Sequence, residues 1–367
     1  MQKTEKKKLS VTDVLKNIVG RQIFIPIAAL LALVLFNLIM DPGFFAITLK
    51  TNSAGNPVFT GNLITILDYG SELAILAIGM TLVTAAAGGQ DISVGAGIAI
   101  SGSVILRVLC GSTTPWPDEM QAPVIVAFLA GCLAAVLCGA FNGVLVAYFK
   151  IQPMVATLIL YTAGRSIAAW INLNRLPIVN DKSFSYFGSI IPGIPIPTPI
   201  FITAACLIII ALLMKFTTLG LYTQSVGINE SSSRLNGLNP IFIKFLAFVI
   251  LGLCVAVAGL IKVSRLSTIN YSVIAKDIEM DAILAVALGG NVLSGGKFNI
   301  AASVLGAYVI QFLTTTLYKF DVRSDSLPAY KAIVVIVLVV LSAPTVRRYL
   351  NGFKKKLTLR LSRKEVG

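Results

Sequence analysis

The sequence contains no histidine and few charged residues. Among 367 residues there is no His, and only 13% are Asp, Glu, Lys or Arg, about half the share found in soluble domains. Histidine is the commonest metal ligand and the usual general base of enzymes. Without it, and without paired carboxylates at helical spacing, we expect neither an enzyme nor a metal site.

The cysteines do not form a recognisable site. They lie mostly in apolar runs, and none belongs to a CxxC pair or to a metal-ligand spacing. We interpret them as small buried apolar side chains, at Cys110, Cys132, Cys138, Cys206 and Cys254.

A nucleotide-binding motif is also missing. The segment GGNVLSGGKFN at 289–299 superficially resembles the phosphate-binding loop GxxxxGK[ST]. The segment does not fit the residue spacing of this motif. Asn291 occupies the place of the first glycine, and Phe298 stands where Ser or Thr would hold magnesium. We therefore expect no cofactor in this chain. If its function uses ATP, a separate subunit must bind ATP and magnesium.

Apolar residues are abundant instead, at 56% of the chain with a mean hydropathy of +0.86. A helix that crosses the hydrocarbon core of a membrane needs about 20 mostly apolar residues. The sequence predicts an all-α integral membrane protein with about ten transmembrane helices, some of them short or broken. The predicted spans are 23–40, 63–87, 91–109, 123–148, 153–173, 198–215, 241–262, 280–296, 298–318 and 328–346.

The positive charge lies mainly at the two ends of the chain. Residues 1–22 hold six Lys or Arg and two acidic residues, and residues 347–367 hold eight and one. Since Lys and Arg are retained on the cytoplasmic side, we expect cytoplasmic segments at 1–22 and 347–367 around a membrane domain at 23–346. No soluble domain accompanies them, so nucleic acid is not an expected partner. A helix lying on the inner leaflet is expected near residues 9–18.

This topology places the connections on two sides. Outside we expect 41–61, 110–122, 174–197, 263–279 and 319–327, and inside we expect the turn at 150–152 and the loop 216–240. The segment 280–296 is short and ends in glycines, which suits a re-entrant or broken helix. Three charged residues fall near predicted helix ends, where snorkelling to the interface would explain them: Glu72, Arg165 and Lys262.

The first candidate site is GGQDISVG at 88–95. Asp91 is costly in lipid unless it faces water, a partner or a helix end. We expect its carboxylate to cap the following helix through the amide of Ser93 or Val94; direct contact with a transported solute is the alternative.

A second segment, GGNVLSGG at 289–296, echoes the first, and AILA precedes both. Transporters are often built from two related halves, with interrupted helices at matching positions beside the pathway. We therefore predict that both segments line or support a translocation pathway. The candidate residues are Gly88, Gly89, Asp91, Ser93, Gly95, Gly289, Gly290, Asn291, Ser294 and Gly296.

The loop 216–240 is the third candidate. Gly227 interrupts the chain, Asn229 is a good helix cap, and Glu230–Leu235 would form a short helix that ends at Gly237. A short capped helix on the inner face presents its side chains rigidly to a partner. An ordinary connection between two spans is the alternative.

These three segments resemble motifs of one family, the ribose-type sugar permeases of bacterial ABC importers. GGQDISVG resembles the family's GGxDLSVG, SVGINESSSRLNGLN resembles its inner loop AVGxNxxAARLSGI, and GGNVLSGGKFNIAASVLGA resembles GGxSLxGGxGxxxGTLxGA. Order and spacing agree over nearly the whole chain, although Gln90 replaces a usual apolar residue. The stretch KIQPMVATLILYTAGRSIA at 150–168 is similar to the galactofuranose-type branch.

The resemblance implies a permease subunit that moves a monosaccharide across the bacterial cytoplasmic membrane. It implies two cytoplasmic ATPase subunits, an extracytoplasmic sugar-binding protein and a second copy or sister permease. The inner loop would be the element that docks on the ATPase, through Gly227, Asn229, Glu230, Ser233, Arg234 and Gly237. The alternative is an ion-coupled secondary sugar transporter, for which only Asp91 is a candidate coupling ligand.

Overall fold

The computed structural model describes residues 23–51, 57–111 and 120–342. The basic segments 1–22 and 347–367, with the surface helix expected near 9–18, lie outside the described residues. Their cytoplasmic placement stays a prediction.

Each of the ten predicted spans overlaps a helix. Six of the described helices are long and apolar enough to cross a membrane, namely α3, α5, α6, α8, α11 and α13. The elements are α2 (Phe24–Met40), β1 (Thr48–Thr51), β2 (Pro57–Thr60), α3 (Asn62–Ala87), α4 (Val94–Cys110), α5 (Val124–Ala147), α6 (Pro153–Ile171), α7 (Lys182–Ser185), α8 (Thr198–Phe216), α9 (Leu219–Ile228), α10 (Glu230–Leu235), α11 (Pro240–Leu266), α12 (Ile278–Leu288), α13 (Ile300–Lys319) and α14 (Leu327–Ser342).

The helix α3 forms the centre of the bundle. Of its most apolar stretch 94% is buried, against 22% for α5 and 11% for α8. The outer helices therefore present apolar side chains outwards, as a surrounding bilayer requires. Small residues let helices approach closely: a Cβ added to Gly252 of α11 would lie 2.7 Å from the carbonyl oxygen of Ala135 in α5.

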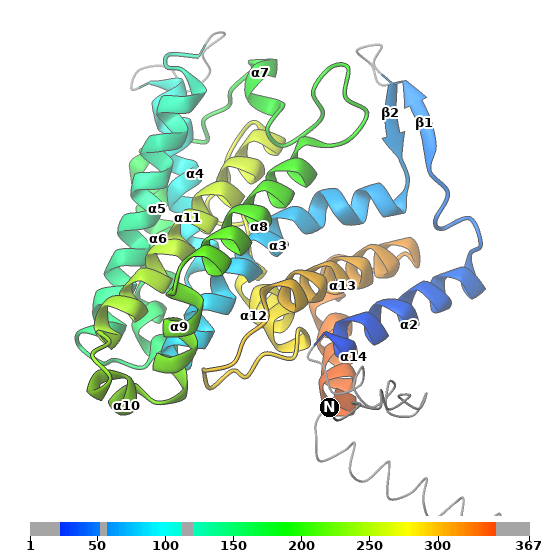
Figure 1. Ribbon diagram of the computed structural model, residues 1–367. Coiled ribbons are helices and arrows are strands. Elements are labelled where there is room, and N and C mark those ends of the chain that lie inside the picture. Colours follow the sequence, from blue (N-terminus) through cyan, green and yellow to red (C-terminus); the bar gives the residue numbers. More distant parts are fainter. Residues whose placement is uncertain (1–22, 52–56, 112–119, 343–367) are drawn as a thin grey trace, which may run out of the picture.

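The described parts of the connections predicted for one side of the membrane lie at one end of the molecule. The amide of Phe59 donates to the carbonyl of Pro195 at 3.0 Å, and Lys319 forms an ion pair with Asp41 at 3.3 Å. Ile178 and Thr268 form an isolated β-bridge. Figure 1 shows α7 and the strands at this end and α9 and α10 at the opposite end. Which end faces the cytoplasm stays a prediction.

The described residues are mostly helical, as predicted, with one short hairpin among the helices. Residues 48–51 and 57–60 form an antiparallel hairpin in which Thr48 lies opposite Thr60. The hydroxyls of this pair are 2.9 Å apart, and Thr and Val are residues that favour strands. The sequence pattern predicted only a loop between two spans here.

The predicted span 280–296 is indeed broken. Helix α12 ends at Leu288, so residues 289–296 are not helical, and the segment 267–277 before it is not helical either. Backbone φ is positive at Ser267, Ala275 and Asp277. Irregular backbone at membrane depth is tolerated only where protein covers it or where it lines a water-filled space.

Candidate functional site

The two echoing glycine segments lie against each other at the α10 end. The amide of Gly296 donates to the carbonyl of Ala85 at 2.9 Å, and the side-chain amide of Gln90 donates to the carbonyl of Leu293 at 3.2 Å. A Cβ at Gly88 would lie 2.8 Å from the carbonyl oxygen of Ser294. The end of α3 is therefore hydrogen-bonded to the segment between α12 and α13. Gln90, which replaces a usual apolar residue of the motif, makes one of these hydrogen bonds.

The third motif joins the same place through Gly227 of α9. A Cβ at Gly227 would collide with the carbonyl oxygen of Ala85 and would lie 2.6 Å from the amide nitrogen of Gly296. Only glycine lets the backbone of α9 come this close to both glycine segments. Three motifs that are far apart in the sequence thus form one contact.

Asp91 is buried beside the first turn of α4, with 3% of its surface exposed. Its Oδ1 accepts hydrogen bonds from the amide of Ser93 at 2.7 Å and from the Ser93 hydroxyl at 2.6 Å. Asn142 of α5 donates to Asp91 Oδ2 at 3.1 Å and to Ser93 Oγ at 2.9 Å. The predicted hydrogen bond to the Ser93 amide is present, but the predicted helix cap is not. Ser93 is itself the N-cap residue of α4 and no side chain caps this helix, so Asp91 closes a turn just before it. Since protein groups occupy both carboxylate oxygens, direct contact with a solute gains no support.

Asn291 has a similar structural role in the second segment. Its side-chain nitrogen donates to the carbonyl of Val286 at 3.1 Å and to the hydroxyl of Ser303 at 2.7 Å. Its oxygen accepts from the amide of Asn299 at 2.6 Å. Thr81 of α3 donates to the same Ser303 hydroxyl at 2.7 Å. This buried network fixes the turn between α12 and α13 and ties it to α3.

The remaining candidate glycines permit close packing. Gly89 lies against Pro153, whose Cγ would be 2.8 Å from an added Cβ. Gly95 faces the start of α12, where an added Cβ would collide with the carboxylate of Glu279. A Cβ at Gly289 would lie 2.8 Å from the backbone of Ala302, and Gly290 has a φ of 73°. These positions support the fold around the motifs.

The predicted short helix of the inner loop is present as α10. Asn229 Oδ1 accepts from the amide of Ser232 at 2.9 Å, and the Ser233 hydroxyl donates to the Asn229 carbonyl at 2.9 Å. Gly237, with a φ of 80°, follows the helix. The start Asn229, the range Glu230–Leu235 and the end Gly237 are therefore confirmed.

An ion pair anchors α10 to the start of α11. Glu230 lies 2.6 Å from Lys244 and 3.5 Å from Arg234. The hydrogen bond from Lys244 is the main reason that the pKa of Glu230 is lowered. The side chain of Leu235, in contrast, is 90% exposed at the tip of this element, which leaves it available to a partner.

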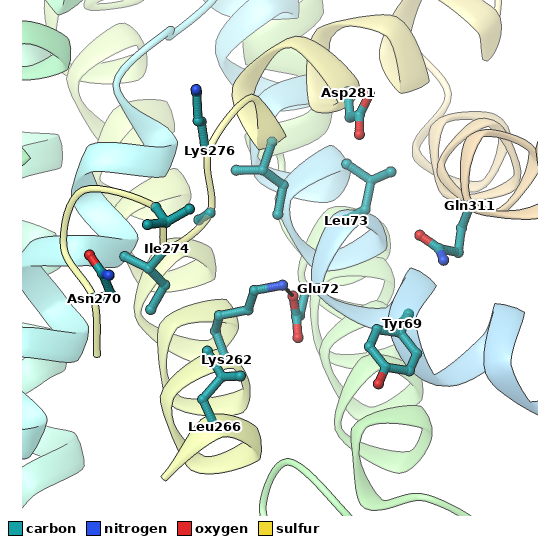
Figure 2. Close-up of a pocket in the computed structure, with 13 residues that line it drawn as sticks. Tyr69, Glu72, Leu73, Lys262, Leu266, Asn270, Ile274, Lys276, Asp281 and Gln311 are labelled. Atoms are coloured by element: carbon teal, nitrogen blue, oxygen red, sulfur yellow. Dashed lines mark hydrogen bonds and ion pairs between the residues drawn. The ribbon is translucent and has the colours of Figure 1, made fainter. Parts of the chain in front are cut away.

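The expectation that Glu72, Arg165 and Lys262 snorkel to the interface was wrong. The Glu72 side chain is only 3% exposed and forms ion pairs with Lys262 at 2.8 Å and Arg265 at 2.6 Å (Figure 2 shows the first). Arg265 also reaches Asp68 at 2.9 Å. A charge inside a membrane bundle is stable when an opposite charge satisfies it, and sequence alone did not reveal these partners.

Arg165 stabilises irregular backbone. Its guanidinium donates to the carbonyls of Tyr271 at 3.0 Å and Ile274 at 2.7 Å. Both carbonyls belong to the non-helical segment before α12. The side chain thus satisfies backbone groups that have no helical partner.

Comparison with known proteins identifies the chain. The family described as branched-chain amino acid transport system / permease component matches residues 62–343. The chain belongs to this family. The predicted resemblance to sugar importer permeases is confirmed by the relatives.

The fructose import permease protein of Bifidobacterium longum is 32% identical over 99% of both chains. The galactofuranose transporter permease protein of Escherichia coli is 34% identical over 90% of this chain and 92% of its own. The ribose import permease protein of Escherichia coli is 32% identical over 85% and 90%. No solved structure gives a significant match.

In this multi-pass membrane permease, most of the predicted site residues lie close together in the structure. The two glycine segments and Gly227 meet at the α10 end, and α10 continues from that contact. Asn142 and Ser303 complete these arrangements, and neither was predicted from the sequence. An uncharged Asn or Ser within an apolar run gives little sign of which buried group it will meet.

Proposed function

We propose that this chain is the membrane-spanning permease subunit of an ABC importer that carries a monosaccharide across the bacterial cytoplasmic membrane. The observation that carries the proposal is the contact of all three family motifs at the α10 end. Relatives that are sugar import permeases by name match the chain along 85% or more of its length. This supports a sugar as the cargo, with the galactofuranose type among the candidates.

The α10 element would dock on a cytoplasmic ATPase subunit, which would bind ATP and magnesium. Its geometry supports this role, because the helix is capped at Asn229, held by the Glu230–Lys244 ion pair, and exposes Leu235. Burial of this apolar side chain against a partner would be favourable. The α7 end would then face outwards and receive an extracytoplasmic sugar-binding protein. Two permeases, identical or sister chains, would enclose the pathway.

A displacement of α10 would be transmitted directly to the helix bundle through α9. Gly227 precedes α10 in the chain and contacts both Ala85 of α3 and Gly296 of the α12–α13 turn. A movement of α10 driven by ATP would therefore shift α9 against both elements. Differential stabilisation of inward- and outward-facing states by the ATPase is what such coupling requires.

Uptake in proteoliposomes tests the function. The permease and its ATPase are reconstituted with ATP inside, and the sugar-binding protein is added outside with labelled fructose, galactofuranose, ribose or arabinose. We expect uptake of at least one sugar that requires the ATPase, the binding protein and ATP. Uptake by the permease alone that follows an ion gradient would instead establish secondary transport.

A second experiment tests docking separately. Replacement of residues 227–237 by a flexible polar linker should abolish co-purification of the ATPase while the permease still inserts. Leu235→Ser should weaken co-purification, and Leu253→Ser, which alters an exposed apolar side chain of α11, serves as the matched control. Retained ATPase binding by the linker variant would refute the docking assignment.

A further inference from the structure

A cavity of about 410 Å³ lies between α3, α11, α12 and α13, beside the non-helical segment that precedes α12. Figure 2 shows Asn270 and Lys276 on one side of it, Tyr69 and Gln311 on the other, and the Glu72–Lys262 ion pair between them. Its volume falls in the range of about 300–1,000 Å³ that is typical of small-molecule sites.

Charged side chains line part of the cavity although its walls belong to an apolar bundle. Glu72 and Lys262 form an ion pair at 2.8 Å, and Asp281 at the start of α12 pairs with Lys331 of α14 at 2.7 Å. Charged side chains are expensive in hydrocarbon and normally face a water-filled space or a partner. This face of the bundle is therefore unsuited to lipid.

Several polar groups in the cavity remain available to a ligand. Within the part of the chain that the structure describes, the side chains of Gln311 and Lys276 make no hydrogen bond or ion pair. Asn270 uses its oxygen to accept from the amide of Ser272 at 3.2 Å, so its NH₂ group is left to donate. Tyr69, a residue 49% exposed, has the Arg265 guanidinium 4.3 Å from its ring centroid on one face, so the other face of the ring adds an aromatic surface.

We propose that this cavity is a contact site for the transported monosaccharide inside the permease. The inference rests on the proposed function and assigns the residues that meet the cargo. A sugar presents several hydroxyls, each both a donor and an acceptor, around a ring whose C–H face packs on an aromatic side chain. The amides of Asn270 and Gln311, the ammonium of Lys276 and the ring of Tyr69 supply these complements.

The backbone beside the cavity is consistent with a pathway. Irregular segments between broken helices line the binding sites of many transporters. Here Arg165, which does not line the cavity, donates to the carbonyls of Tyr271 and Ile274, and Ile274 itself lines the cavity. The segment can thus stay ordered without a ligand.

Transport by two variants tests the assignment. Gln311→Leu removes polar atoms at similar size, and Asn270→Ser keeps an oxygen for the Ser272 amide while withdrawing the NH₂ donor. Using whichever of fructose, galactofuranose, ribose or arabinose the wild type imports, we expect each variant to lower the maximal uptake rate by about two- to tenfold, the value of one lost hydrogen bond. ATP hydrolysis without sugar should be unchanged.

Matched controls are available on the same elements. Thr314→Val lies one turn further along α13 and removes only an internal bond to the Ile310 carbonyl. Ser272→Ala changes an exposed side chain of the same irregular segment. Both should transport like the wild type. Uptake by Gln311→Leu and Asn270→Ser equal to these controls would overturn the cavity while leaving the importer intact, whereas a wild type that imports none of the four sugars would overturn both proposals.

Protection from labelling gives an independent measurement. Val273→Cys places a thiol at the cavity, and Lys182→Cys places one on α7 at the same end of the molecule. With a membrane-impermeant thiol reagent, millimolar sugar should slow the labelling of the first variant only. Equal labelling rates with and without sugar at both positions would contradict the proposal.

Discussion

The amide nitrogen of Gly296 donates a hydrogen bond of 2.9 Å to the carbonyl oxygen of Ala85. Ala85 lies in the last turn of α3, and Gly296 belongs to the second glycine segment. The bond therefore joins the two segments whose sequences echo each other. Gly227 packs on the same pair of backbone groups, so any change there acts on all three motifs.

Replacement of Gly227 by alanine should uncouple sugar uptake from ATP hydrolysis. The added Cβ would collide with the Ala85 carbonyl, and α9 would have to move away from α3. We expect loss of most ATP-dependent uptake, measured in proteoliposomes. Gly220→Ala in the same helix is the control. The atom nearest to its added Cβ, the sulfur of Met214, would be 3.4 Å away, and alanine favours helix. Normal uptake by Gly227→Ala would contradict the close packing.

Replacement of Asp91 by asparagine should be tolerated, because the side-chain oxygen of asparagine can accept the same hydrogen bond from the Ser93 amide and close the same turn. Its NH₂ group would face the NH₂ group of Asn142, but the Asn142 oxygen is buried without a partner among the described residues. A flip of the Asn142 amide therefore restores the hydrogen bond. We expect most transport to remain.

Asp91→Ala provides the contrast. It removes the hydrogen bonds from Ser93 and leaves Asn142 without an acceptor at Asp91, at a cost of about 1–3 kcal/mol, which thermal unfolding in detergent should detect. Complete loss of uptake in Asp91→Asn with normal stability would instead point to a role for the charge.

Replacement of Glu72 by glutamine should destabilise the permease more than Lys262→Met. The Glu72 carboxylate faces two cations, Lys262 and Arg265. Removing Lys262 leaves Glu72 paired with Arg265. Breaking a buried ion pair costs about 3–5 kcal/mol. Glu72→Gln should lower the free energy of unfolding by less than this, because Arg265 keeps its ion pair with Asp68. Thermal unfolding of both variants without sugar gives the comparison, and an equal loss would refute the asymmetry.

The stability of α10 should depend on pH only in acid. The Lys244 hydrogen bond lowers the pKa of Glu230 from its ordinary value of 4.5. A lowered pKa contributes stability above the ordinary value, and this stability is lost as the pH falls through the lower folded value. Glu230→Gln should therefore weaken hydrogen-exchange protection of α10 at neutral pH. The difference from the wild type should disappear in acid, and a constant difference would contradict the ion pair.

The helices themselves could be predicted from the sequence. Runs of about 20 apolar residues have few stable alternatives in a bilayer, and all ten predicted spans overlap helices. Two local hydrogen bonds were also predicted correctly: Asn229 caps α10 through the amide of Ser232, and Asp91 accepts from the amide of Ser93 in a turn before α4. The small hairpin at 48–60 was missed, since four-residue strands give a weak pattern.

The sequence by itself determined the class of protein, the positions of its helices and the three motifs, because these depend on local composition and on short-range hydrogen bonds. Only the tertiary structure decided that the motifs meet at Gly227 and that Glu72 pairs with Lys262 and Arg265. Such contacts join residues far apart in the chain, and they are fixed by which helix faces pack together. An isolated charge or glycine does not carry that information.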